Sequence, residues 1–118
     1  MTIENAGATY FKAWQARDFD LLRTVLADDV DFLGPLGTAR GADECLAGLK
    51  GMAQILTGIE IRKVFVDGDD VLTWFDLSTS VAPTVPCANW MRFSDGKIDR
   101  IRVTFDARGI AAGLGRLP

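Results

Sequence analysis

The chain contains no histidine, and this absence narrows the chemistry that it can carry out. Without histidine there is no Ser-His or Cys-His nucleophile pair and no His-ligated metal site. The only two cysteines, Cys45 and Cys87, stand apart in apolar stretches, so we expect buried free thiols and no four-thiolate zinc site. No glycine-rich phosphate loop precedes a helical pattern. Acid–base chemistry must use Asp, Glu, Tyr, Lys or Arg, and we expect neither a metal nor a cofactor.

Dense basic segments and long apolar runs are also missing. The chain has 13 Lys and Arg against 16 Asp and Glu, which gives a formal net charge of −3. Without a basic run, nucleic acid is not an expected partner. No apolar run approaches the roughly 18 residues that indicate a membrane span. The opening MTIENAGATY lacks the basic start and the apolar run of a signal peptide. We therefore expect a cytoplasmic protein without a membrane partner.

The proportions of hydrophobic and charged residues are those of an ordinary globular protein. Of 118 residues, 48% are hydrophobic and 25% are charged, which predicts one domain over residues 1–118 with a genuine core. The spacing of apolar side chains predicts three helices. They cover residues 3–16, residues 19–27 behind an Asp18 cap, and the stretch from Gly41 or Asp43 to a stop at Gly58.

Alternating apolar segments predict strands after these helices, with one short strand before the third helix. The strands cover residues 30–33, 59–67, 71–80, 87–93 and 98–106. Residues 34–37 form a turn, residues 67–70 and 94–97 form hairpin turns, and Pro83 and Pro86 bracket a connection. The glycine-rich tail ARGIAAGLGRLP is expected to be mobile unless a partner subunit orders it. Helices followed by antiparallel hairpins indicate the α+β class.

Alternation assigns the faces of some strands but not of others. Ile101, Val103 and Phe105 share one side of their strand, which should face the helices. On residues 71–77 the more apolar side is the one that carries Val71 and Phe75, so periodicity turns that side inward. On residues 87–93 neither side is purely apolar, and the pattern leaves the orientation open.

The stretch from Tyr10 to Gly37 has a layout of two helices, a break, a short strand and a Gly-Pro turn. With Ala27-Asp28-Asp29-Val30 closing the second helix, it resembles the opening of ketosteroid isomerases and SnoaL-like polyketide cyclases. Both belong to the nuclear-transport-factor-two-like superfamily. The resemblance covers about residues 6–106. It implies a cone-shaped α+β fold, in which a curved antiparallel sheet wraps around three N-terminal helices and leaves an internal apolar pocket.

The same resemblance implies an oxyanion hole made of Tyr10 and Asn89. In ketosteroid isomerases a Tyr on the first helix and a protonated Asp on a late strand hold the reacting oxygen. TYFKAWQARDFD resembles the first motif and supplies Tyr10, and Asn89-Trp90-Met91-Arg92-Phe93 resembles the second. The family has Asp where this chain has Asn89. An Asn amide donates hydrogen bonds at any pH, so it can keep the donor role without a raised pKa.

The catalytic base of ketosteroid isomerases, an Asp just before the Pro of a Pro-x-Gly turn, is replaced here by Gly34. The resemblance offers Asp76 instead, because it turns Asp76 inward against the periodicity of its strand. A buried Asp76 would have a raised pKa and could transfer protons near neutrality. The resemblance also implies a set of substrate-binding residues. These are Trp14, Phe32, Leu72, Trp74, Cys87, Met91, Ile101, Val103 and Phe105.

These residues favour a cofactor-independent isomerase or cyclase that acts on a small hydrophobic carbonyl compound, either steroid-like, terpenoid or polyketide. One alternative is a binding module without turnover, because the base position is Gly34. Another is an epoxide-hydrolase-like enzyme, because Phe105-Asp106 resembles the end of the last strand in limonene-epoxide-hydrolase-like members. Superfamily members commonly pair through the convex sheet face, so we also expect a homodimer. That face would carry Trp90, Arg92, Arg100 and Arg102.

Overall fold

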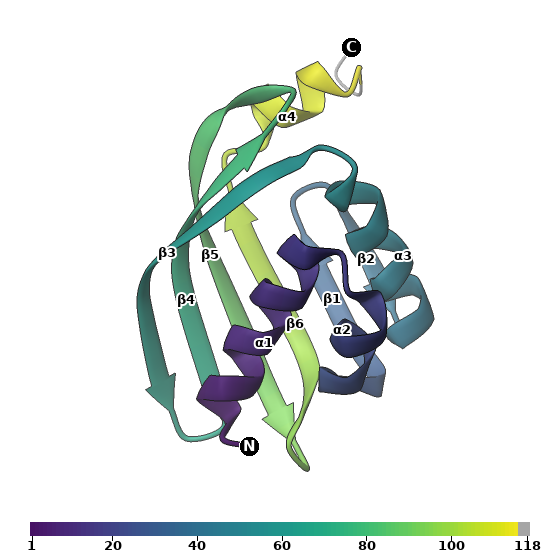
Figure 1. Ribbon diagram of the computed structural model, residues 1–118, viewed down its shortest axis with the longest axis vertical. Helices are drawn as coiled ribbons and strands as arrows, with labels where there is room; N and C mark the ends of the chain where they lie inside the picture. The colour runs from purple at the N-terminus through teal and green to yellow at the C-terminus, as the bar shows by residue number, and fades with distance from the viewer. Residues whose placement is uncertain (116–118) are drawn as a thin grey trace.

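The computed structural model describes residues 1–115 and has the predicted α+β architecture (Figure 1). The helices are α1 (Ile3–Ala16), α2 (Phe19–Val25), α3 (Ala42–Ala53) and α4 (Arg108–Gly113). The strands are β1 (Leu26–Gly34), β2 (Gly37–Arg40), β3 (Leu56–Asp67), β4 (Asp70–Thr79), β5 (Ala82–Ser94) and β6 (Lys97–Phe105).

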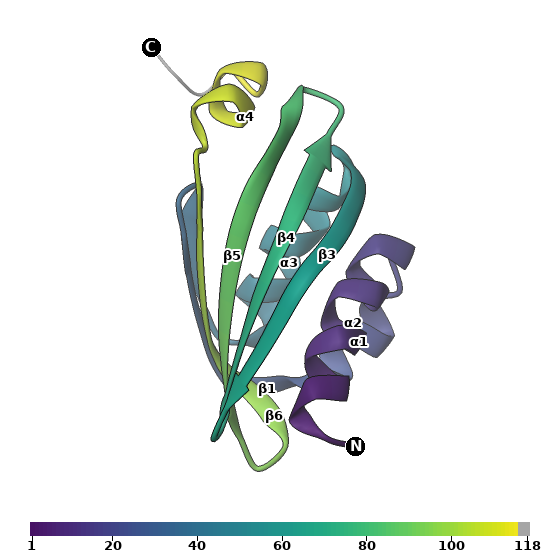
Figure 2. The same ribbon diagram turned by 90° about the vertical axis from the view of Figure 1, so that its left-hand side faces the viewer.

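The strands form one sheet in the order β2-β1-β6-β5-β4-β3. Neighbouring strands are antiparallel except β1 and β6, which are parallel. The sheet is curved and open, and α1, α2 and α3 cover one of its faces (Figures 1 and 2). Within this layer α1 contacts β3 and β4, whereas α3 contacts β1 and β2. α1 and α3 therefore lie over opposite edges of the same inner face, and the middle of that face lies between the two helices.

Local sequence signals set the ends of the first two helices. Thr2 caps α1, because its hydroxyl accepts a hydrogen bond from the Asn5 N–H at 3.1 Å. Arg17 ends α1 in the left-handed region with φ 56°. Asp18 caps α2, as predicted, by accepting from the Leu21 N–H at 3.1 Å. This tight link sets α2 at an angle to α1, and α2 leads directly into β1 (Figure 1).

Two stretches that were predicted to be irregular belong to the sheet. β2 includes Gly37, which was assigned to a turn, and β5 begins at Ala82, so it includes Pro83 and Pro86. Proline is tolerated at these positions because pairing between β5 and β6 starts only at Cys87. Residues 82–86 pair with β4 alone, and their other edge needs no backbone donor.

The C-terminal tail is ordered in part, contrary to the prediction of a mobile segment. Residues 108–113 form α4, which packs against β5 and buries Ile110 and Ala111. It lies at the end of the molecule opposite the N-terminus (Figure 2). Residues 116–118 of the same tail lie outside the described part of the chain.

The outer face of the sheet is exposed and combines apolar and charged side chains. Phe65, Leu72, Trp90 and Arg102 are neighbours across four strands and form one row on this face. Phe65 is 58% exposed, Leu72 42% and Trp90 40%. The Trp90 Nε1 donates to Asp70 Oδ1 at 2.8 Å, which fixes the indole on the surface. Such an exposed apolar row is typical of an interaction surface.

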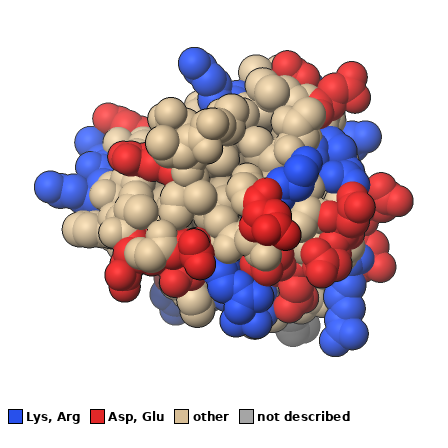
Figure 3. All heavy atoms as spheres, turned by 90° about the horizontal axis from the view of Figure 1, so that it is seen from below, with Lys and Arg blue, Asp and Glu red and all other residues tan. Residues whose placement is uncertain are grey.

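Elsewhere on the surface, charges of both signs are interspersed. At the end of the molecule near the N-terminus, acidic and basic groups alternate around an uncharged centre (Figure 3). None of the helices in residues 1–115 is both long and apolar enough to span a membrane.

We propose that the outer face pairs with a second copy of the chain. Acidic Asp67 and Asp70 lie on its β3–β4 side, whereas Arg100 lies on its β6 side, next to the Arg102 that is paired with Asp31 within the chain. A twofold axis near the row would bring each acidic side toward the partner's basic side. Light scattering at micromolar concentration should give twice the 12.8 kDa of one chain. Leu72→Asp should give the monomer mass, because it places a charge in the apolar row.

The matched control for this prediction is Leu21→Asp. Leu21 is exposed to a similar degree, 39%, but it lies on α2, away from the outer face. This variant should keep the wild-type mass. A monomeric wild type, or a Leu72→Asp variant of unchanged mass, would contradict pairing through the outer face.

Candidate functional site

An apolar pocket of about 430 Å³ lies between the inner face of the sheet and the helices α1 and α3. Its wall takes residues from α1, β1, the β1–β2 turn, β2, α3, β4, β5 and β6, with Ile55 after α3 and Leu114 after α4. Seven residues that the resemblance placed in the site lie in this wall. They are Tyr10, Trp14, Phe32, Cys87, Asn89, Val103 and Phe105.

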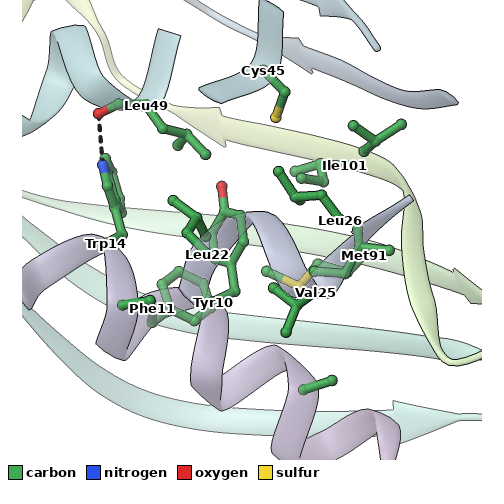
Figure 4. Packing of buried hydrophobic residues seen from close by; sticks show 14 of the residues in the cluster. Tyr10, Phe11, Trp14, Leu22, Val25, Leu26, Cys45, Leu49, Met91 and Ile101 are labelled. Atoms are coloured by element: carbon green, nitrogen blue, oxygen red, sulfur yellow. Dashed lines mark hydrogen bonds between the residues drawn. The ribbon is translucent and has the colours of Figure 1, made fainter. Parts of the chain in front are cut away.

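Tyr10 and Asn89 form the polar end of the pocket. Tyr10 is 1% exposed and Asn89 is 2% exposed. Asn89 points inward from β5, while its neighbour Trp90 lies on the outer face, which is the orientation that the resemblance implied and the pattern left open. The Tyr10 side chain points its hydroxyl toward α3 (Figure 4). Their proposed role as an oxyanion hole stays a prediction.

Burial keeps Tyr10 a neutral hydroxyl. Desolvation raises the pKa of Tyr10 well above its ordinary value of 10.0, and the nearby Cys45 and Cys87 thiols add to this rise. The Asn89 side chain, which lies within hydrogen-bonding reach of the Tyr10 oxygen, lowers the pKa in part. A protonated Tyr10 can donate a hydrogen bond to a ligand oxygen across the whole physiological pH range.

The aromatic side of the pocket is fixed by a buried hydrogen bond. Trp14, one turn after Tyr10 on α1, donates from Nε1 to the Leu49 carbonyl oxygen of α3 at 2.9 Å (Figure 4). Phe11, on the same helix, packs on Tyr10 with ring centroids 5.1 Å apart. This bond joins α1 to α3, the two helices that supply this side of the pocket wall.

The two thiols belong to the pocket wall and are neutral. Both cysteines are buried and unpaired, as expected. Burial raises the pKa of Cys45 from 9.0 to about 11 and that of Cys87 from 9.0 to about 12. Thiols with such pKa values are poor nucleophiles near neutrality, so they act as small apolar wall residues. Across residues 1–115, no group of three or more side chains of the metal-ligating types gathers at one place.

Asp76, Leu72 and Trp74 are not in the pocket, and the placement implied by the resemblance is wrong for these three residues. They lie on the outer face of β4, where Trp74 is 43% exposed. Asp76 Oδ2 accepts hydrogen bonds from Arg62 Nε at 2.9 Å and Arg62 Nη2 at 2.7 Å. The physical reason is burial: turning this strand the other way would expose Val71, Phe75 and Leu77 and bury a carboxylate.

Met91 and Ile101 face inward but do not line the pocket, so their substrate-binding assignment is not supported by their position. They are cross-strand partners, and both are 0% exposed. Figure 4 places them beside Val25 and Leu26, where α2 closes the narrow end of the fold. There the sheet and helices meet directly, and side chains fill the space that is open farther along β5 and β6.

Asp106 lies outside the pocket at the end of β6. It accepts from the Arg108 backbone N–H at 3.2 Å and from Arg108 Nε and Nη2 at 2.9 and 2.7 Å. These bonds to Arg108 lower the pKa of Asp106 from 3.8 to about 2. An exposed carboxylate held in this way has no access to a pocket ligand.

Glu44 is the one carboxylate that lines the pocket among the residues that the structure describes. It lies in the first turn of α3, and its Oε1 accepts from the Arg40 N–H at 3.1 Å. Its side chain is exposed, which places it at the rim. Sequence reasoning missed Glu44, although Glu44 and Gly48 stand one helical turn apart, and both line the pocket.

Gly34 also lines the pocket, at the position of the family's base. A Cβ on Gly34 would lie 3.0 Å from Phe32 Cε1 and 3.7 Å from Val103 Cβ. A side chain at position 34 would therefore enter the pocket if the Phe32 ring shifted by a few tenths of an ångström.

Comparisons with known proteins agree with this architecture. The family model of the SnoaL-like domain matches residues 8–101. A Kribbella flavida protein of solved structure is 28% identical, with a TM-score of 0.86 over 94% of this chain and 92% of that one. An NTF2-like protein of Cytophaga hutchinsonii is 21% identical, with a TM-score of 0.85 over 93% and 95%. A Mycobacterium tuberculosis LEH-like epoxide hydrolase is 24% identical, with a TM-score of 0.78 over 97% and 90%. A search of curated proteins found no match.

We predict that Gly113→Ala separates α4 from the sheet and removes Leu114 from the pocket wall. A Cβ on Gly113 would lie 2.4 Å from the Val81 carbonyl oxygen, which is backbone and cannot move aside cheaply. Overpacking of this kind costs about 1–3 kcal/mol. The expected result is faster tryptic cleavage after Arg108 and a lower melting temperature.

Gly109→Ala is the matched control on the same helix. Its Cβ would lie 3.5 Å from Ala82 Cβ, an ordinary contact. This variant should be cleaved at the wild-type rate. Equal cleavage of both variants would show that α4 is not held by the close approach at Gly113.

Proposed function

We propose that this chain, which belongs to the SnoaL-like domain family, is a cofactor-independent isomerase or cyclase that acts on a small hydrophobic carbonyl compound. The observation that carries the proposal is the pocket itself: an apolar wall with one buried polar pair, Tyr10 and Asn89. A steroid-like, terpenoid or polyketide ligand would bury its carbon skeleton in the wall and place one oxygen at this pair.

Tyr10 and Asn89 would stabilise negative charge on the carbonyl oxygen as it develops. Both are neutral donors, and both are held rigidly by buried packing. Donors that are already in place act strongly in a water-poor site, because they need no reorganisation during the reaction. This arrangement favours an enolate-like transition state.

Glu44 is the carboxylate that we assign to proton transfer, in place of Asp76. It would take a proton from the carbon next to the carbonyl, and the C–H electron pair would form the C=C bond of the enolate. In isomerisation the same proton returns to another carbon. In cyclisation the enolate carbon attacks a second carbonyl of the chain. Neither route needs an oxidant, a reductant or a metal.

A binding module without turnover is the second candidate. It is favoured by Gly34, which removes the side chain that serves as base in the resembling isomerases. An epoxide hydrolase has less support. The likeness to the Mycobacterium tuberculosis LEH-like epoxide hydrolase, at 24% identity, concerns the fold. Asp106, the residue that would carry that chemistry, is bound to Arg108 outside the pocket.

The test is a direct assay of β,γ- to α,β-enone isomerisation by the wild type, Glu44→Gln and Asp76→Asn. Loss of a general base lowers kcat by about 10²–10⁴-fold, and we expect a loss of this size for Glu44→Gln. Asp76→Asn makes the same chemical change outside the pocket and should retain the wild-type rate. Gly34→Asp should raise the rate, because it restores a carboxylate at the family's base position. Gly34→Ala, which adds only the Cβ, measures the steric cost of that change.

Three outcomes would revise the proposal. A wild-type rate in Glu44→Gln would remove Glu44 from the mechanism. A loss of activity in Asp76→Asn would restore the outer carboxylate and contradict the pocket as the site. No turnover in any variant, with an enone still bound, would favour the binding module.

A further inference from the structure

Two glycines in α3 face the pocket, and the conformation of the helix does not require them. Gly48 and Gly51 lie inside the helix, line the pocket and are exposed. A glycine inside a helix is less favourable than an alanine, because its backbone loses more freedom on folding. Neither Gly48 nor Gly51 has the positive φ that favours glycine elsewhere in the chain. Their presence therefore weakens α3 without any gain in backbone geometry.

Close packing against another segment does not explain these glycines either. A Cβ added to Gly48 or Gly51 would have no described atom within 4 Å, apart from the adjoining residues and backbone turns of α3. At Gly113, by contrast, an added Cβ would collide with Val81. Glycine also serves where a ligand approaches the backbone closely. The open space beside Gly48 and Gly51 is thus available to a group from outside the chain.

The pocket wall is elongated along α3, and the two glycines lie within this length. Glu44, Gly48 and Gly51 are spaced i, i+4 and i+7, so they share one side of the helix, and all three line the pocket. With a rise of about 1.5 Å per residue, these positions span about 10 Å. Ile55 continues the wall just after the end of α3. The wall therefore has room for a long molecule lying along the helix.

A separate observation at the sheet side of the pocket points to a ligand. Asn89 is 2% exposed and lines the pocket, and its Oδ1 has no hydrogen-bond partner in the described part of the chain. Buried polar side-chain atoms nearly always have a partner in native proteins. A molecule bound in the pocket can supply the partner that the described residues do not.

We propose that Gly48 and Gly51 determine ligand specificity by leaving room at the α3 side of the wall for the far end of an elongated hydrophobic ligand. One end of the ligand would lie in the apolar interior, and the other would cross the bare backbone of α3 toward solvent. A larger side chain at either position would occupy that path. The inference rests on the proposed function and narrows its substrates to compounds with an apolar chain or further ring that the pocket does not enclose.

The experiment measures the binding of two probes to the full chain by isothermal titration calorimetry. 2-Naphthol is compact, and 6-hexyloxy-2-naphthol carries an apolar chain on the same ring system. We expect the wild type to bind the longer probe about tenfold more tightly, because part of the chain is buried along α3. Gly48→Leu and Gly51→Leu should each lose about this tenfold gain and bind 2-naphthol as the wild type does.

Ala47→Leu is the matched control. Ala47 is exposed on the same helix, next to Gly48, but it does not line the pocket. This variant should bind both probes with wild-type affinity. The melting temperature provides a second readout. Each Gly→Leu variant should melt about 4 °C above the wild type, because leucine favours a helix more than glycine does. A loss of affinity in a variant that melts higher cannot result from unfolding.

The outcomes distinguish this inference from the proposed function. Wild-type affinity of both Gly→Leu variants for the longer probe would overturn the inference. An equal loss in Ala47→Leu would also overturn it, because the effect would then not belong to the pocket side of α3. If the wild type binds 2-naphthol but gains nothing from the hexyloxy chain, the inference fails and the apolar pocket function stands. If neither probe binds the wild type, the proposed function fails, and the inference fails with it.

Discussion

A buried pair of polar side chains, Tyr10 and Asn89, in an otherwise apolar interior is the constraint on which the site depends. Tyr10 comes from α1 and Asn89 from β5, so the pair joins the helix layer to the middle of the sheet. An unpaired amide or hydroxyl in such a place destabilises the fold by about 1–3 kcal/mol. The Asn89 Oδ1 has no partner among the described residues, and both side chains line the pocket. The same arrangement that positions the pair therefore gives the apolar pocket its one buried polar end.

The cavity follows from how two helices cover one curved sheet. α1 packs on the β3–β4 side and α3 on the β1–β2 side, and α2 closes the narrow end. The Trp14–Leu49 hydrogen bond joins α1 to α3. At the narrow end Met91 and Ile101 fill the interior. Farther along the same strands, Cys87, Asn89, Val103 and Phe105 face open space. One pair of strands thus supplies both core and pocket wall.

Most of the strand orientations and pocket residues could be predicted from the sequence, and the wrong predictions have physical causes. Alternation on β6 placed Ile101, Val103 and Phe105 inward, and on β4 it correctly favoured the face with Phe75. The resemblance turned the wrong face of β4 inward and so placed Asp76 in the pocket. In the structure Asp76 lies on the outer face, because burying an unpaired carboxylate would cost free energy. For β5 the pattern was ambiguous, and the resemblance placed Asn89 inward, where the structure has it. Glu44 was missed because a helix-start carboxylate usually serves the helix alone. The helix α4 was missed because its glycines disfavour a helix and only two of its residues, Ile110 and Ala111, are buried.

The most direct test of the central claim is a crystal structure with 2-naphthol bound. We expect the naphthol oxygen to lie within about 3.2 Å of both the Tyr10 hydroxyl and the Asn89 amide. We also expect the naphthol rings to lie against the apolar wall near Trp14 and Phe105. A naphthol oxygen turned toward Glu44 and the rim, with Tyr10 and Asn89 contacting only carbon, would contradict the claim that this pair binds the ligand's polar group.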